Sequence, residues 1–269
     1  MPTNKQRRQA AQRRLQRQIE RRAELARKRR RNLLVVAAVV AVVVVAGAAF
    51  LIANLGGDDD SSTTAADTSS AAPSIDGADG SCDFTAGTTE NPNLKDVGTP
   101  PAEVATSGLV DLTMTTNLGV INLSLDQAKA PCATASFVYL TQQKFFDGTP
   151  CHRETDSEGL KVLQCGDPSG TGSGGPTYQF PTQVTGSETY PRGTVAMANS
   201  GQGFDGSQFF LVYGDSQLSP DYTVVGTIDD AGLAVLDAIA ANGNNGANGT
   251  GDGAPNQPVT ITTMTLGQQ

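Results

Sequence analysis

A run of 23 residues without a charged side chain is the feature that most limits how this chain folds. Residues 33–55 read LLVVAAVVAVVVVAGAAFLIANL, and Asn54 is their one strongly polar residue. Because a helix rises about 1.5 Å per residue, about 20 apolar residues cross the hydrocarbon core of a membrane. A cleaved signal peptide is the alternative, but its apolar region usually has about 7–15 residues. The run therefore predicts an uncleaved, single-pass transmembrane anchor over residues 32–55.

The charges around this run predict its orientation. Residues 1–31 carry 13 of the 19 Lys and Arg residues and two acidic residues, whereas Asp58–Asp60 follow the run. Positive charge stays on the cytoplasmic side, so we expect a basic cytoplasmic tail over residues 1–31 and the rest of the chain outside the cell membrane. Binding of the tail to anionic lipid or RNA is the alternative, and we favour a role in topology alone.

The remainder of the chain is acidic, and its composition excludes several classes of function. Residues 32–269 hold 6 basic and 25 acidic side chains, which argues against nucleic acid as a partner because phosphate binding needs clustered Lys and Arg. One His and four Cys, without a CxxC or HxxxH spacing, offer no zinc site. We expect no metal and no cofactor. The G-x-S-x-G motif of serine hydrolases is also absent from the sequence.

Composition divides the part beyond the anchor into three segments. Residues 56–81 are rich in Asp, Ser, Thr, Ala and Gly; such a segment buries too little apolar surface to offset its ordering entropy, which predicts a flexible, disordered linker. Residues 82–107 contain scattered apolar side chains that would pin an extended arm onto a domain. Residues 108–269 are enough for one hydrophobic core.

Short alternating segments dominate that last region. Apolar and polar residues alternate over Leu109–Thr115 and Val120–Leu125 on either side of a turn at 117–119, which is a hairpin signal. Further strands are expected over 162–164, 193–197, 208–213, 222–228 and 259–266, and helices over 130–145 and 232–241. Many short strands with two helices predict a mainly-β fold, a closed β-barrel capped by both helices.

The four cysteines fit an oxidising location outside the cell. Two disulfides are expected, and the sequence alone leaves three pairings open. We favour Cys151–Cys165, which flank a strand–loop–strand unit, together with Cys82–Cys132, which would fasten the arm to the first helix. A catalytic thiol at Cys151 is disfavoured because its base would have to lie across the site rather than beside it in sequence.

Five islands of sequence occur in a fixed order and carry the chemistry. They are LDQAKAPCATASFVYL (125–140), CHR (151–153), LQCGDP (163–168), MANSGQGFDGSQFFL (197–211) and LSPDYTVVG (218–226). In this order they resemble the cyclophilins, the peptidyl-prolyl cis-trans isomerases. The resemblance covers about 108–269 and is similar in form to the membrane-anchored or secreted cyclophilins of high-GC Gram-positive bacteria. It implies a cyclophilin-like barrel that isomerises X-Pro bonds of exported or cell-surface proteins.

The resemblance also implies roles for the residues that match. Arg153 matches the catalytic arginine of the family, and His152 matches the histidine beside it, with a packed strand position as the alternative. Phe209 is expected in the core and Phe210 in the proline pocket. The other substrate-binding residues implied are Gln164, Gly172, Ala198, Asn199, Ser200, Gln208, Leu218 and Tyr222.

The chain departs from the family pattern around the proline pocket. The segment 154–160 is longer than the corresponding loop, and Lys161 and Val162 then occupy the positions of the pocket Phe and Met, unless Leu160 shifts into the Phe role. Gln217 stands where many members have the tryptophan tied to cyclosporin binding, and Tyr222 where many have a histidine. We expect an altered proline pocket, retained activity and weakened cyclosporin binding.

The implied reaction needs no covalent bond to the enzyme. An X-Pro amide resists rotation with a barrier of about 18–20 kcal/mol, and a hydrogen bond to the prolyl nitrogen would weaken its resonance. Arg153 is the expected donor, while Asn199 and Gln208 would hold the peptide. A module that binds Pro-containing polypeptides with little turnover is the alternative. The G-x-G-x-x-G matches at 170–175 and 201–206 are interpreted as loops, because neither follows a strand and opens a helix.

Overall fold

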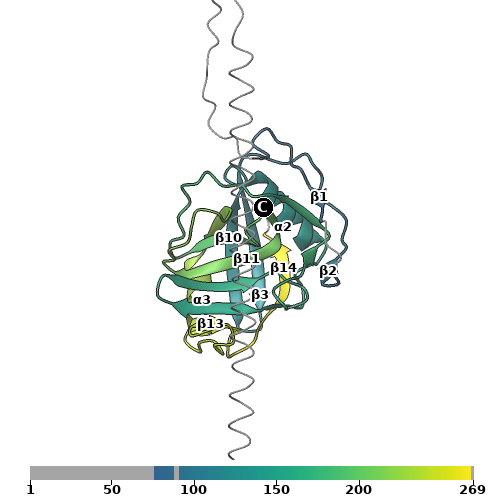
Figure 1. The fold of residues 1–269 in the computed structure, drawn as a ribbon. Coiled ribbons are helices and arrows are strands. Elements are labelled where there is room, and N and C mark those ends of the chain that lie inside the picture. The colour runs from purple at the N-terminus through teal and green to yellow at the C-terminus, as the bar shows by residue number, and fades with distance from the viewer. Residues whose placement is uncertain (1–75, 88–90, 268–269) are drawn as a thin grey trace, which may run out of the picture. The chain divides into compact units, whose positions relative to one another are not determined.

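The curled sheet in Figure 1 contains 12 strands, and a two-stranded sheet lies beside it. The computed structural model describes residues 76–87 and 91–267. The strands of the large sheet are β1 (Thr85–Ala86), β3 (Leu109–Thr116), β4 (Gly119–Asp126), β5 (Thr149–Cys151), β6 (Arg153–Ser157), β7 (Leu160–Cys165), β9 (Tyr178–Pro181), β10 (Thr194–Asn199), β11 (Phe204–Gly214), β12 (Val224–Ile228), β13 (Asp252–Gly253) and β14 (Val259–Leu266). The small sheet consists of β2 (Leu94–Lys95) and β8 (Gly175–Pro176), and the helices are α2 (Pro131–Gln142) and α3 (Asp230–Ala240).

The large sheet curls but its hydrogen-bonded ladder does not close. Its order is β13-β6-β7-β11-β10-β12-β4-β3-β14-β5, with β9 beside β11 and β1 beside β9. Two covalent links connect β5, at one end of this ladder, to strands near the other end. The chain runs from β5 into β6 through His152, and the Cys151–Cys165 disulfide connects β5 to β7. The predicted closed barrel is therefore a curled half-barrel sheet in the described residues, with a covalently bridged seam beside Arg153.

The alternation read from the sequence explains the hairpin of β3 and β4. Leu112 pairs with Leu123 and Met114 with Ile121, and all four side chains are buried on the inner face of the sheet. A one-residue slip would turn these side chains to solvent, which fixes the register. The same inner face continues into β11, where Phe209 is fully buried, as expected.

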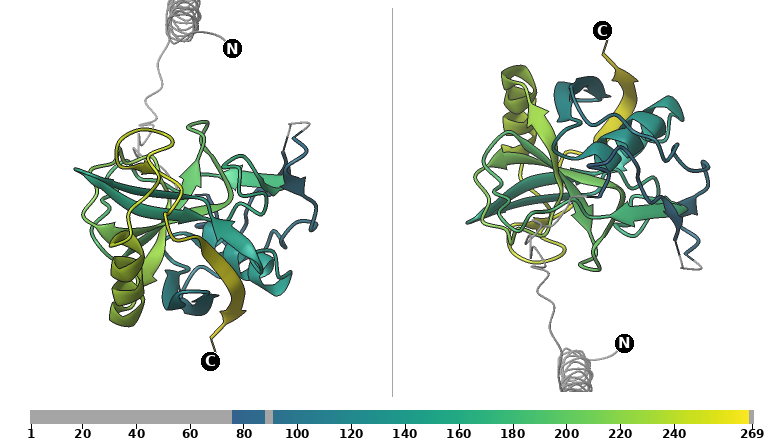
Figure 2. Two further views of the ribbon diagram at one scale, coloured as in Figure 1. Left: turned by 90° about the horizontal axis from the view of Figure 1, so that it is seen from below. Right: turned by 90° about the horizontal axis from the view of Figure 1, so that it is seen from above.

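The two helices cover the open parts of this core (Figure 2). Helix α2 starts at Pro131, whose fixed φ suits a first helical turn, and it places Phe137 with its ring centroid 5.0 Å from that of Phe209. It ends at Gln142, short of the predicted Phe145, because Lys144 adopts a left-handed φ of 52°.

Helix α3 begins earlier than predicted because an acidic residue caps it. The carboxylate of Asp229 accepts a hydrogen bond from the backbone N–H of Gly232, so the helix starts at Asp230 rather than at residue 232. Leu236 and Ile239 are its buried apolar side chains and pack into the core.

The arm over residues 82–107 lies along the side of the sheet and is tied to it in several places. Both preferred disulfides are present, and Cys82–Cys132 joins the arm to α2. Strand β1 pairs with β9, and β2 pairs with β8 in parallel. The residues before the arm are also packed, since Ser81 bridges to Glu103.

Residues 154–157, expected within a loop over 154–160, belong to β6, which pairs with β7 from Arg153–Gln164 to Ser157–Leu160. No helix among residues 76–87 and 91–267 is long and apolar enough to cross a membrane. The anchor expected over 32–55, the tail over 1–31 and most of the linker over 56–81 lie outside the described residues.

Candidate active groove

A small cavity of about 200 Å³ opens where β6, β7, β10 and β11 meet the loop that precedes β12. One part of its wall is apolar and the other is polar. The apolar part consists of Leu160, Val162, Ala198, Phe210, Leu218 and the ring of Tyr222, and the polar part of Arg153, Gln164 and Asn199. A cavity with a mainly apolar lining and a few directed polar groups is the usual form of a small-ligand site.

Strand alternation explains why these side chains meet. Residues 160, 162 and 164 of β7 lie on one face, so Leu160 and Val162 both line the cavity, while Lys161 between them is exposed. The sequence left open whether Lys161 or Leu160 takes the position of the pocket Phe. Leu160 lines the cavity and Lys161 does not. Across the sheet Arg153 pairs with Gln164, and Gln164 pairs with Phe210.

The guanidinium of Arg153 is held on two sides. Its Nε and Nη2 donate to the two carboxylate oxygens of Asp252 at 2.8 and 2.7 Å, and its Nη1 donates to Gln164 Oε1 at 3.2 Å. The hydrogen bond to Asp252 raises the pKa of Arg153, and the same bond lowers the pKa of Asp252. A guanidinium has five N–H donors, so two remain without a partner among the described residues. The side chain of Arg153 is one-third exposed and lines the cavity.

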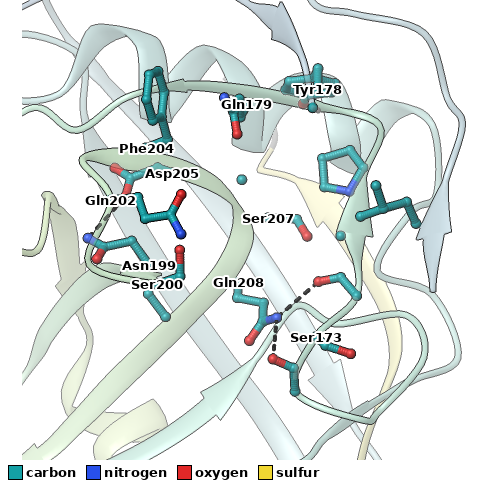
Figure 3. Close-up of a pocket in the computed structure, with 18 of the residues that line it drawn as sticks. Ser173, Tyr178, Gln179, Asn199, Ser200, Gln202, Phe204, Asp205, Ser207 and Gln208 are labelled. Carbon is teal, nitrogen blue, oxygen red and sulfur yellow. Dashed lines mark hydrogen bonds between the residues drawn. The ribbon is translucent and has the colours of Figure 1, made fainter. Parts of the chain in front are cut away.

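A chain of amide hydrogen bonds continues from Arg153 along the groove. Gln164 Nε2 donates to Gln208 Oε1 at 2.9 Å. Gln208 Nε2 donates in turn to the backbone carbonyls of Gly172 and Gly174, at 3.1 and 2.9 Å, as Figure 3 shows. The conformation of the glycine-rich loop is thus connected to the side chain of Arg153.

A second, larger cavity of about 420 Å³ adjoins the first. The two share Gln164, Ala198 and Asn199 in their linings. The larger cavity is lined further by polar and small residues, among them Gly172, Ser200, Gln202, Ser207 and Gln208 (Figure 3). Because they share lining residues on β7 and β10, the two cavities are described together as one groove.

A buried carboxyl group forms part of this second cavity. Asp205 is 1% exposed, accepts a hydrogen bond from Thr223 Oγ1 at 2.6 Å, and lies 3.5 Å from Asn199 Nδ2. Burial raises the pKa of Asp205 to about 6, against the opposing effect of these two hydrogen bonds. Figure 3 shows Asp205 and Asn199 next to one another at one end of the cavity.

His152 is not brought to either cavity. It lies in the link between β5 and β6, beneath Gly172, where a Cβ on the glycine would be 3.6 Å from the histidine Cδ2. Its Nδ1 is buried without a hydrogen-bond partner in the described part of the chain. Burial lowers the pKa of His152, Asp167 acts to raise it and Arg153 to lower it, so the ring is neutral at neutral pH. The packed strand position therefore describes His152 better than a place in the groove.

The other predicted site residues come together in the groove, but sequence reasoning missed two important acids. Asp252 belongs to a Gly- and Asn-rich loop and lies 99 positions from Arg153, so no spacing or periodicity connects the two. Asp205 stands within the MANSGQGFDGSQFFL island, yet it was not selected. It lies in β11, and its alternation with Ser207 and Phe209, which are also buried, was the signal that could have shown its burial.

The comparisons with known proteins agree with this geometry. Residues 111–266 match the family described as cyclophilin type peptidyl-prolyl cis-trans isomerase/CLD. The chain belongs to this family. A cyclophilin fold explains both the curled sheet with two helices and the groove beside β6, β7, β10 and β11.

Several curated relatives of this cyclophilin come from bacteria. It is 48% identical over 198 residues to the probable peptidyl-prolyl cis-trans isomerase B of Mycobacterium leprae, covering 69% of this chain and 64% of the relative. The corresponding protein of Mycobacterium tuberculosis strain H37Rv is 48% identical over 187 residues, covering 65% and 58%. The chain thus spans less than two thirds of these relatives, which fit the expected resemblance to high-GC Gram-positive cyclophilins. A Helicobacter pylori peptidyl-prolyl cis-trans isomerase is 40% identical over 130 residues, 47% of this chain and 78% of that one.

A solved structure with the same fold comes from Cryptosporidium parvum. It is a cyclophilin type peptidyl-prolyl cis-trans isomerase with a TM-score of 0.52 and 24% identity, and the match covers 60% of this chain and 99% of that one. The same protein, determined in the presence of the dipeptide Ala-Pro, matches with 25% identity and a TM-score of 0.52 over 59% and 99%.

Proposed function

We propose that this cyclophilin is a peptidyl-prolyl cis-trans isomerase. The observation that carries the proposal is the position of Arg153, whose guanidinium lines a largely apolar cavity of about 200 Å³ and keeps two N–H groups without a partner among the described residues. This cavity presents an apolar surface on which a proline ring can pack, because it is lined by Phe210, Leu218, Leu160 and Val162. The names of the relatives support the same activity.

The chemistry follows from the electronic structure of the X-Pro amide. Resonance gives its C–N bond partial double-bond character, with a rotation barrier of about 18–20 kcal/mol. In the twisted state the prolyl nitrogen becomes pyramidal and its lone pair becomes available. An N–H of Arg153 that donates to this lone pair stabilises the twisted state more than either planar state, and such differential binding is catalysis. No proton is transferred, so a permanently charged guanidinium suits the task.

The rest of the groove would hold the peptide on one side of the rotating bond. Asn199 and Gln208 present amide groups beside the cavity, and the second cavity extends the groove away from the proline pocket. The Cryptosporidium structure determined with Ala-Pro supports a proline-containing peptide as the ligand class. A fixed segment on one side and free rotation on the other would let the amide turn within the site.

The test is acceleration of a proline-limited refolding reaction. Uncatalysed X-Pro exchange takes tens to hundreds of seconds, so catalytic amounts of the full chain should shorten the slow phase of a model protein with a native cis-proline. All samples contain the same mild detergent because of the apolar run at 33–55. A folded, disulfide-intact chain that leaves the slow phase unchanged would refute the enzyme proposal.

One observation favours the alternative of a binding module with little turnover. The ion pair with Asp252 engages two of the donors of Arg153 and fixes the guanidinium, so its two remaining donors reach the prolyl nitrogen only in the orientation that the pair allows. If this orientation does not meet the nitrogen, the groove would bind Pro-containing segments without accelerating their isomerisation. Titration with an Ala-Pro peptide alongside the refolding assay separates the two functions, since the alternative predicts binding without acceleration.

We further propose that the protein is anchored in the cell membrane by residues 33–55, with its cyclophilin domain outside and exported or cell-surface proteins as clients. The support is the uncharged run, the 13 basic residues before it, and two disulfides in the domain. Protease added to intact cells should remove the domain and spare the tail. Recovery of the chain in the soluble fraction after lysis would contradict the anchor.

We expect the bridged seam between β5 and β6 to make the sheet behave as a closed barrel, held by His152 and Cys151–Cys165. We also expect weak binding of cyclosporin, because exposed Gln217 supplies no aromatic surface beside the pocket. Inhibition of the refolding assay by cyclosporin at stoichiometric concentration would contradict this last expectation.

A further inference from the structure

The arm over residues 82–107 touches the groove although it lies outside the family match, which begins at residue 111. Gly87 and Leu94 of the arm line the larger cavity together with residues of the domain. The arm therefore does more than lead the chain into the first strand of the domain.

We define residues 169–175 as the glycine loop. The arm contacts the second half of this loop. Asn91 Nδ2 donates to the Ser173 carbonyl at 2.6 Å, and Asn93 Nδ2 donates to the hydroxyls of Thr171 and Ser173 at 3.3 and 2.9 Å. A Cβ on Gly174 would lie 2.9 Å from the Asn93 carbonyl oxygen, so arm and loop backbones are in close contact.

The first half of the glycine loop has a different support. Asp167 accepts hydrogen bonds from the N–H groups of Ser169 and Gly172 and from the Ser169 hydroxyl. Gly174 also lies against this carboxylate, since a Cβ on it would be 2.0 Å from Asp167 Oδ1, and its backbone helps to lower the pKa of Asp167. By contrast, the Ser173 carbonyl accepts its hydrogen bond from Asn91 of the arm.

The arm is also anchored to the core, independently of the glycine loop. Cys82 is bonded to Cys132 of α2, Phe84 packs edge-on against Phe180 at 5.5 Å between ring centroids, and Tyr139 Oη donates to the Val97 carbonyl at 2.5 Å. These attachments lie on both sides of Asn91 in sequence. The arm is thus a fixed frame, and the glycine loop is the part that it positions.

The glycine loop in turn holds a side chain of the groove, that of Gln208. The carbonyls of Gly172 and Gly174 accept both donors of the Gln208 amide (Figure 3), and Gln208 Oε1 accepts from Gln164, whose own Oε1 accepts from Arg153. A displaced Gly174 carbonyl leaves Gln208 with one acceptor and lets its side chain rotate. The effect falls first on peptide binding, because Asp252 still holds Arg153.

We propose that the arm forms part of the substrate-binding groove. Asn91 is a positioning residue that fixes the orientation of the Gln208 side chain through the Ser173–Gly174 segment. This inference rests on the proposed isomerase function. It assigns to residues outside the cyclophilin match a part in substrate recognition. A short segment of the chain that joins the linker to the domain thereby becomes part of the site.

The substitution Asn91→Asp tests the proposal with little change in shape. Asn91 Oδ1 accepts from the Asn93 N–H at 3.0 Å, and a carboxylate keeps this turn while it loses the donor and repels the Ser173 carbonyl. Asn117→Asp is the matched control. Asn117 also donates to a backbone carbonyl, that of Pro258, and accepts from the N–H of Thr260, but it lies in the β3–β4 turn away from both cavities.

The measurements are the KM and kcat of X-Pro peptide isomerisation by the full chain, and the side-chain amide signals of Gln164 and Gln208 by NMR. We expect Asn91→Asp to raise KM roughly three- to ten-fold, the loss typical of one hydrogen bond, with kcat within about two-fold. Its amide signals should shift. Asn117→Asp should match the wild type in all of these.

Each outcome decides a different claim. If the wild type and Asn117→Asp are active and Asn91→Asp equals them in KM and in both amide signals, the inference about the arm is wrong while the proposed function stands. If the wild type does not accelerate isomerisation, the proposed function is wrong and the inference falls with it. A drop in the unfolding temperature of Asn91→Asp alone, without a change in KM, would also overturn it, because the residue would then be merely structural.

Discussion

Arg153 and Asp252 form a bidentate ion pair in which the arginine Nε and Nη2 donate to the two carboxylate oxygens at 2.8 and 2.7 Å. With Gln164 on Nη1, this pair leaves one N–H on each terminal nitrogen without a partner among the described residues, and Arg153 lines the cavity. Planar, two-point contact fixes the rotation of the guanidinium as well as its position. The ion pair thus presents the remaining donors in one orientation before any peptide arrives.

The substitution Asp252→Asn should reduce isomerase activity more than stability. The amide still accepts one hydrogen bond but no longer offers two oxygens, so the guanidinium becomes free to rotate. We expect kcat/KM to fall by roughly ten-fold, since small displacements of a catalytic group are costly, and stability to change by less than about 1 kcal/mol because the pair is partly exposed. Peptide kinetics and urea denaturation measure the two effects. An increase in kcat/KM would instead show that Asp252 competes with the substrate.

Truncation of Leu160 tests the altered wall of the proline pocket. Leu160 lines the cavity and is only half-buried, so Leu160→Ala should weaken binding of a proline peptide about three- to ten-fold and leave the fold nearly as stable. Val162 is 3% exposed, and Val162→Ala should cost roughly 1–3 kcal/mol of stability as well. Peptide titration and thermal unfolding of both variants provide the measurement. Unchanged affinity in Leu160→Ala would show that the ring binds elsewhere.

The elements that the sequence predicted well are those whose side chains alternate against a single core. Leu112, Met114, Ile121 and Leu123 define β3 and β4 by their period, and Pro131 marks the start of α2. Strand β6 could not be found this way. Its sequence, RETDS, is polar, and it is held by its pairing with β7 and by a hydrogen bond from Tyr213 to buried Glu154 at 2.8 Å.

The site could be predicted as far as the islands of sequence reach. Arg153, Gln164, Asn199, Gln208 and Phe210 meet in the groove as expected. Contacts from outside those islands could not be foreseen. The Asp252–Arg153 pair and the support of Ser173 by Asn91 join segments 99 and 82 positions apart, and only the folded topology brings them together.

The buried carboxyl of Asp205 predicts a pH-dependent stability. Burial raises its pKa in the folded state to about 6, above its ordinary value of 3.8, so the fold favours the protonated form. The stabilisation is complete below about pH 4 and is lost as the pH rises through 6. Asp205→Asn should therefore be more stable than the wild type at pH 8 by about 1–3 kcal/mol, and nearly equal at pH 4.

Urea denaturation between pH 4 and pH 8 checks this expectation. Asp221→Asn, which changes an exposed acid in the neighbouring loop, is the matched control and should leave the pH profile unaltered. A constant difference between Asp205→Asn and the wild type across this range would show that the carboxyl does not titrate there.

Removal of the disulfides should destabilise the domain to different extents. The Cys82–Cys132 bridge spans 50 residues and Cys151–Cys165 spans 14, so loop-closure entropy predicts losses of about 4 and about 3 kcal/mol for the respective paired Cys→Ala variants. Urea denaturation gives the free energies of unfolding. A larger loss for the shorter bridge would mean that its position across the seam between β5 and β7 matters more than the length of its loop.

The most direct test of the account is the rate of cis-trans exchange of an Ala-Pro peptide while it is bound, measured by exchange NMR. We compare the wild type with Arg153→Ala and with Arg192→Ala, since Arg192 forms a similar bidentate pair with Asp237 away from the groove. Loss of one preorganised donor typically costs a factor of about 10² to 10³. We therefore predict that Arg153→Ala slows bound-state exchange at least about 100-fold with little change in peptide affinity, whereas Arg192→Ala exchanges like the wild type. Equal exchange rates in all three proteins would contradict the claim that Arg153 drives the isomerisation.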